Sequence, residues 1–152
     1  MKTFSASRGF SLFELLLVIA MIAIVAGVSM PYGLSYFRTQ TLNSIESQMA
    51  DVLDKARNQS VVQKDDAQYG VYMQASSSLK YYLFKGSSYT AQPTDEPYDV
   101  PPDTTIVFPG SLQTILFSKH TGMPSATGTI TISRDSMSRT IIIDSFGNLI
   151  KS

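Results

Sequence analysis

Hydrophobic and polar residues divide the chain into four segments. A short polar and basic segment, residues 1–9, precedes an apolar block at residues 10–28. Residues 31–63 place apolar side chains three and four positions apart, which is typical of an amphipathic helix. From residue 64 to 152, short β-type runs are separated by Gly, Pro, Ser and Asp, which is typical of strands and turns. We therefore expect a leader, a membrane helix over residues 10–30, a second helical segment and a β-rich head.

The apolar block has the length of a membrane-spanning helix. Its 19 residues would rise roughly 28 Å as an α-helix, close to the ~30 Å hydrocarbon core of a bilayer. Lys2 and Arg8 precede it without an acidic residue, which predicts a cytoplasmic N-terminus and a head on the other side. A cleaved secretory signal with a poor site near Ala26 and a simple signal anchor are the alternatives.

Glu14 is the one charged residue inside the apolar block. A carboxylate at the centre of a membrane helix costs on the order of 2.5–3.5 kcal/mol, and less near an end. Such a residue indicates a function that depends on a partner of opposite charge. A simple anchor explains the length of the block but not Glu14.

The stretch RGFSLFELL, residues 8–16, resembles the processing site of type IV prepilins and type II secretion pseudopilins. The resemblance implies cleavage after Gly9 by prepilin peptidase, N-methylation of Phe10, and pairing of Glu14 with the Phe10 amine of a neighbouring subunit. Gly9 suits such a site because a residue without a side chain lets the chain lie extended in a peptidase groove. The implied partners are other pilin or pseudopilin subunits, an inner-membrane assembly platform and membrane lipid.

Beyond the membrane segment, Gly27 and Pro31 predict a kink, either a bend or a locally melted turn, because proline removes a helical hydrogen bond. A membrane-exit linker of similar composition is the alternative. The following helical segment carries an apolar stripe that predicts packing under a sheet. The stripe consists of Leu42, Ile45, Met49, Val52, Leu53 and Ala56.

The head contains runs of β-type residues separated by turn signals. They lie at residues 68–74, 79–85, 104–109, 112–119, 128–135 and 139–145, with a short seventh run at 147–151. Residues 74–80 are expected to form a turn, and residues 86–103, with four of the seven prolines, a long exposed loop. A helix followed by hairpin-connected strands predicts an α+β, pilin-like fold in which a long N-terminal helix packs on an antiparallel sheet head.

The C-terminal stretch more loosely resembles the H-type pseudopilin and minor pilin group (GspH/FimT-like). The shared features are an aromatic residue, a turn, two strands and a closing glycine. The matching positions are Phe117, Gly122, Pro124, Gly128, Ile130, Ile132, Ile141, Ile143 and Gly147. Most of these are core or turn residues.

The amino-acid composition excludes several kinds of binding and metal site. Twelve basic and twelve acidic residues give zero net charge, which excludes bulk attraction to nucleic acid. The chain has no cysteine and one histidine, His120, which excludes disulfides, thiolate metal sites and His-pair metal sites. We predict no enzymatic activity, no cofactor and no metal. The acids between Asp95 and Asp103 are interpreted as a solvated loop, with weak Ca²⁺ binding as the alternative.

The sequence therefore predicts a pilin-like subunit of the inner membrane. It would assemble, as a minor subunit rather than a major one, into a type II secretion pseudopilus or a type IV pilus that serves protein secretion, DNA uptake or motility. The alternative is a membrane-anchored head that binds DNA or a secreted protein and does not polymerise. A further hypothesis is DNA contact, with a scattered basic surface as the alternative. The residues concerned are Lys119, Arg134, Arg139 and Lys151.

Overall fold

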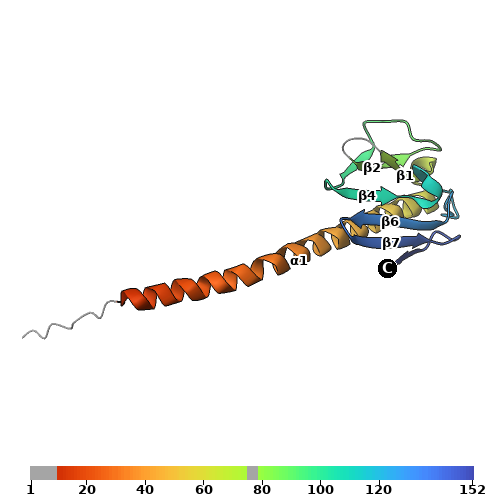
Figure 1. Ribbon diagram of the computed structural model, residues 1–152. Helices are drawn as coiled ribbons and strands as arrows, with labels where there is room; N and C mark the ends of the chain where they lie inside the picture. The colour runs from red at the N-terminus through yellow and green to blue at the C-terminus, as the bar shows by residue number, and fades with distance from the viewer. Residues whose placement is uncertain (1–9, 75–78) are drawn as a thin grey trace, which may run out of the picture. The chain divides into compact units, whose positions relative to one another are not determined.

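The computed structural model describes residues 10–74 and 79–152, and it leaves out the side chains of residues 28–35. The chain forms two compact units, Met1–Arg38 and Thr39–Ser152, which are described separately. Helix α1 (Leu12–Val61) begins in the first unit and ends in the second (Figure 1). The turn predicted at residues 74–80 falls largely on residues 75–78, which lie outside the described residues.

Helix α1 continues through Gly27 and Pro31, so the predicted local melting is wrong. A proline inside a helix costs about 3 kcal/mol, but it removes only one hydrogen bond of the ladder. Helix propagation adds one bond per residue on either side of it, so the helix does not end there. The predicted bend at this position stays a prediction.

Within the second unit, the predicted apolar stripe of α1 is confirmed as part of the core, because all six of its residues are buried. Polar positions outside the stripe are not all open to solvent. Glu46 is only 8% exposed, and Lys55, which a four-residue helical spacing would pair with Asp51, pairs instead with Glu96 (Nζ to Oε2, 2.6 Å). The head folds back over helix faces that spacing alone marks as open to solvent.

Within the described residues, the head forms two four-stranded antiparallel sheets, which confirms the α+β fold. The first has the order β3-β2-β1-β5 and the second the order β4-β6-β7-β8. All seven predicted strands are present, with an eighth. Their bounds are β1 (Tyr69–Gln74), β2 (Lys80–Lys85), β3 (Glu96–Asp99), β4 (Thr104–Val107), β5 (Thr114–Phe117), β6 (Gly128–Arg134), β7 (Met137–Ile143) and β8 (Leu149–Lys151), with short 3₁₀ helices η1 (Lys64–Asp66) and η2 (Pro109–Ser111).

Strand β3 lies inside the predicted loop 86–103, so that prediction is wrong in part. Pro97 pairs with Tyr82 of β2, and a proline is tolerated there because β3 is an edge strand. The rest of the loop is also anchored. Tyr89 stacks on Tyr72 with ring centroids 3.9 Å apart and lies edge-on to Phe84.

The core forms between the inner faces of both sheets and the second part of α1 (Figure 1). Alternate residues of β6 and β7 point inward, as the two-residue period of a strand with one buried face requires. The inward residues are Ile130, Ile132, Ile141 and Ile143, each at most 1% exposed. Side chains from two sheets that cannot bury their faces alone thus share one core.

Two C-terminal glycines lie against the last turns of α1. Gly122 (φ +65°) has no room for a side chain, because a Cβ atom would lie 2.7 Å from Val61 Cγ2. At Gly147 (φ +79°) a Cβ atom would lie 2.5 Å from the carbonyl oxygen of Gly122. The Arg57 guanidinium donates to the carbonyl of Phe146 (3.0 Å). These contacts fix both loops to the end of the helix.

The turn before β8 is held by Asp144. Its carboxylate accepts hydrogen bonds from the amides of Phe146 and Asn148 and from the side-chain amide of Asn148, each 2.8 Å long. The bonds from Asn148 and Phe146, with the nearby positive charge of Arg57, hold the pKa of Asp144 below its usual range. The charged carboxylate is therefore the form that closes this turn.

We predict that Gly122→Ala destabilises the head more than Gly110→Ala does. Gly110 has nearly the same backbone angle (φ +64°) and open space around it. Its alanine variant should therefore lose only the stability that a left-handed residue costs, about 1–2 kcal/mol. Gly122→Ala adds the clash with Val61. Urea unfolding followed by circular dichroism measures the free energy of unfolding of both variants. Equal losses of stability would show that packing at Gly122 is unimportant.

A second prediction concerns pH. Because the folded-state pKa of Asp144 is lowered, its stabilisation is present above the unfolded-state value of about 3.9 and is lost as pH falls through the folded-state value. Asp144→Asn should therefore be less stable than the native protein at pH 7, and the gap should shrink towards pH 2. Unfolding midpoints at several pH values measure this, and a constant gap would contradict it.

Candidate functional site

The candidate site begins where helix α1 begins. Ser11 precedes the helix, and its hydroxyl oxygen accepts a hydrogen bond from the Glu14 amide (3.2 Å), while its carbonyl accepts from Leu15 (3.1 Å). This is the geometry of a helix N-cap. Phe10 lies just outside the helix and is 81% exposed. Gly9, the predicted cleavage position, lies outside the described residues.

Glu14 is exposed and occupies the third position after the Ser11 cap. The sequence Ser-x-x-Glu is the pattern of a capping box, in which the acid favours the positive end of the helix dipole. The sequence analysis missed this local role, although the spacing was visible. Glu14 therefore has two interpretations, a partner-seeking charge and a helix-start residue, and an experiment must separate them.

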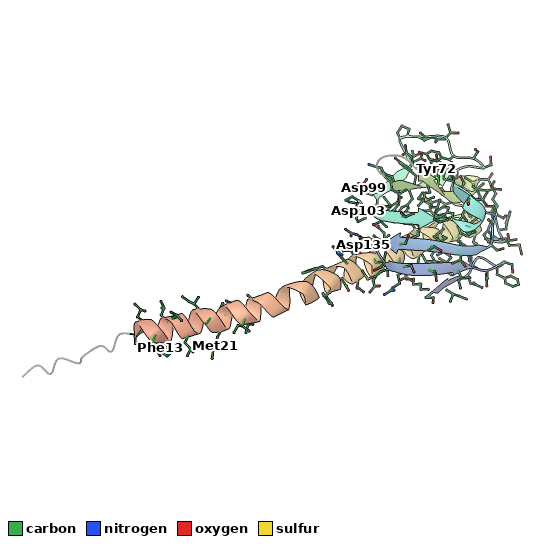
Figure 2. All side chains as sticks on the ribbon, in the orientation of Figure 1. Phe13, Met21, Tyr72, Asp99, Asp103 and Asp135 are labelled. Atoms are coloured by element: carbon green, nitrogen blue, oxygen red, sulfur yellow. The ribbon has the colours of Figure 1, made fainter. Side chains whose placement is uncertain are left out.

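The first turns of α1 expose apolar side chains on every side (Figure 2). Eleven such residues between Leu12 and Val25 are 42–83% exposed. They are Leu12, Phe13, Leu15, Leu16, Leu17, Val18, Ile19, Met21, Ile22, Ile24 and Val25. A helix that is apolar all round is stable only when lipid or other chains surround it.

A search of the described residues finds no helix that is long and apolar enough to cross a membrane. The membrane span predicted over residues 10–30 thus stays a prediction.

The structure places three of the four proposed DNA-contacting residues on the adjacent strands β6, β7 and β8, with Lys151 opposite Ile141, two residues from Arg139. Arg134 and Arg139 lie on the neighbouring strands β6 and β7, and both are partly buried. The Arg139 Nε donates to Asn43 of α1 (2.9 Å), and the Arg134 Nε is buried without a partner among the described residues. These guanidinium groups pack against the head rather than project as a basic patch.

Lys119 lies apart from that pair. Its Nζ donates to Asp66 Oδ1 (2.9 Å), and the next residue, His120, donates its amide to the carbonyl of Ser60. Ser60 is 17 residues along α1 from Asn43, a separation of roughly 25 Å in a helix. Lys151, on β8, is exposed. The hydrogen bond and charge of Lys119 lower the pKa of Asp66, so this lysine serves a local ion pair.

Three of the four acids in the predicted loop have partners within the head. Glu96 accepts from Lys55 and from the Tyr98 hydroxyl (2.8 Å), which lowers its pKa. Asp99 pairs with Lys80 (2.8 Å), and Asp95 accepts from the Gln92 amide (2.8 Å). Within the described ranges, no three acidic or histidine side chains gather into a metal site.

A cavity of about 520 Å³ lies between the end of α1 and the loop after β2. Charged groups line it, and Asp65 there accepts from the Tyr69 hydroxyl (3.0 Å) and pairs with Lys85 (3.4 Å). The Tyr69 bond and the Lys85 charge lower the pKa of Asp65.

His120 is exposed, and its Nδ1 lies 2.9 Å from Gln63 Nε2. These are surface contacts, and they bring no nucleophile and base together.

Comparison with known proteins bears on both units. Residues 4–30 match the family described as "Prokaryotic N-terminal methylation motif", and this range includes Gly9, Phe10 and Glu14. The curated proteins contain no significant match.

Two crystal forms of the type IV minor pilin FimU from Pseudomonas aeruginosa (strain PAO1) share the fold. One is 15% identical, with a TM-score of 0.63 over 77% of this chain and 92% of that chain. The other is 16% identical, with a TM-score of 0.60 over 73% and 92%. The chain has the fold of a type IV minor pilin. The resemblance to the type IV pilin and pseudopilin family that the sequence indicated is thereby confirmed.

Proposed function

We propose that this chain is a minor pilin-like subunit that is cleaved after Gly9, N-methylated on Phe10 and assembled into a filament with other pilins. The observation that carries the proposal is the exposed apolar start of α1, which begins inside the methylation motif. Such a surface is unfavourable in water. Lipid before assembly and neighbouring helices after assembly would cover it.

In this proposal the protein starts in the inner membrane as a single-pass precursor. Its N-terminus is in the cytoplasm and its head is outside, because the basic residues Lys2 and Arg8 favour the cytoplasmic side. Prepilin peptidase and an assembly platform are then its first partners. The fold likeness to a type IV minor pilin favours a pilus over a type II secretion pseudopilus, and the H-type pseudopilin remains the second candidate.

Glu14 is proposed to guide assembly. Cleavage creates a cationic amine on Phe10, and opposite charges attract strongly where water is excluded. A neighbour's amine would remove the cost of holding the Glu14 carboxylate in an apolar environment. The attraction would thus set the axial register of one subunit against the next.

The first test is the mature N-terminus. Removing nine residues leaves 143 of 152, and the loss of Lys2 and Arg8 takes the formal net charge from zero to −2. We expect intact-mass spectrometry of the membrane form to give a chain that starts at N-methylated Phe10. A start after Ala26 or Gly27 would instead identify ordinary secretion.

The second test separates the two interpretations of Glu14. Glu14→Ala should be inserted and cleaved normally but be lost from sheared filaments, because the charge partner is gone. Glu14→Gln keeps the capping-box geometry without the charge, so it should also fail if Coulomb attraction dominates. Ser11→Ala removes the cap, worth about 1 kcal/mol, and keeps the charge, so it should assemble. The measurement is the ratio of subunit in filaments to cleaved subunit in the membrane.

If Ser11→Ala and Glu14→Ala fail equally, Glu14 acts through the helix start and the pairing proposal is wrong. Wild-type assembly of Glu14→Ala would also contradict the pairing.

A further inference from the structure

Strand β8 has one side of its backbone unpaired among the described residues, because it is the last strand of its sheet. Ser152 and Thr140 exchange both backbone hydrogen bonds (3.0 and 2.9 Å). In an antiparallel pair of strands, hydrogen-bonded and non-hydrogen-bonded residue pairs alternate. The backbone N–H and C=O of Ile150 therefore also point toward β7. The amides and carbonyls of Leu149 and Lys151 therefore point away from the sheet.

The other three sheet edges have a proline in or near the edge strand, or outward backbone groups that are already bonded, and such features hinder strand addition. Pro97 lies in β3, and Pro102 and Pro109 flank β4. At β5, the backbone is occupied, because the Ser125 amide donates to the carbonyl of Leu116 (2.7 Å) and the Ser125 hydroxyl accepts from the Leu116 amide (3.0 Å). Strand β8 has no proline and no covering segment in the described part of the chain. It is the edge left open.

The side chains of β8 define what an added strand must carry. Ile150 is 56% exposed and pairs with Ile142, 39% exposed, on the outer face of the sheet. Lys151 and Leu149 lie opposite Ile141 and Ile143 on the inner face. No acidic side chain in the described ranges forms an ion pair with Lys151. The edge thus offers an apolar row and a cation.

We propose that β8 is a docking edge for an extended strand of another protein, in antiparallel orientation. Read from its N-terminus, this strand places an acid opposite Lys151, a β-branched residue opposite Ile150 and an apolar residue opposite Leu149. Main-chain hydrogen bonds supply the affinity in such strand addition, and the alternating side chains supply the specificity.

Charge complementarity favours a different chain over a second copy. In the register that pairs two β8 edges through all four outward groups, Ile150 faces its own equivalent and Lys151 faces Leu149. That arrangement leaves both lysines without an acid. The inference goes beyond the proposed function, because it concerns the head and does not depend on Glu14 or on cleavage.

The test is amide hydrogen exchange by NMR on the full chain in detergent micelles. In the isolated protein, the amides of Leu149 and Lys151 should exchange faster than those of Ile150 and Ser152, which face β7. The probe is the capped peptide Thr-Glu-Val-Leu-Thr. At half occupancy it should slow the two outward amides by about twofold. The same peptide N-methylated on its Glu and Leu residues, which removes the required donors, should not.

Three variants give matched controls. Lys151→Pro removes an outward donor while the inward bonds of Ile150 and Ser152 remain, so it should abolish peptide binding. Lys151→Ala keeps the donor and loses only the charge, so it should weaken binding less and remove the preference for Glu over Lys in the probe. Val107→Asp, on the opposite edge of the same sheet and 45% exposed, should leave binding unchanged, whereas Ile150→Asp should reduce it.

Protected Leu149 and Lys151 amides in the isolated protein, together with a dimeric mass, would overturn the proposal in favour of self-pairing. It is also overturned if the peptide slows neither amide, or if the N-methylated peptide acts equally. Each result is independent of filament assembly, so it is distinguishable from a failure of the proposed function.

Discussion

Helix α1 carries two different distributions of apolar side chains along one continuous helix, and the rest of the structure depends on how each of them is buried. Its first turns are apolar on every side, whereas from Leu42 onward only a stripe is apolar. The stripe is buried by strands of the same chain. The first turns have no such cover among the described residues of their own unit, so an all-round apolar helix there would be buried only by lipid or another chain. The apolar surface of the chain is therefore covered from within only in the second unit.

Much of the fold could be predicted because simple periodicities decide it. The alternation of Ile130 and Ile132 with polar residues marks a half-buried strand, and three- and four-residue steps mark the helix stripe. Strand β3 was missed because Pro97 argues against a strand, a rule that fails at a sheet edge. The pairing of Lys55 with Glu96 was missed because it joins residues 41 positions apart, which local spacing does not reveal.

The residues of the candidate site could likewise be predicted only in part. Gly9, Phe10 and Glu14 lie within one short stretch, so a local sequence motif alone predicts them as a site, and the matched family spans them. The four basic residues were chosen only for sharing a charge. Topology then assigned Arg139 to Asn43 of α1 and Lys119 to Asp66, at distant points of the head. A linear sequence does not show which strands and loops lie side by side, so it cannot predict whether scattered basic residues form a patch.

The contacts between the start and the end of the head have a consequence for biogenesis. Thr39 meets Met137 and Asn43 meets Arg139, residues 98 and 96 positions apart. Folds dominated by such distant contacts form slowly, because long loops must close before any contact stabilises them. The stripe of α1 thus lacks its full cover until β6 and β7 have been synthesised. A head of this design completes its core only when nearly the whole chain has been made, and until then an apolar face of the helix stays exposed.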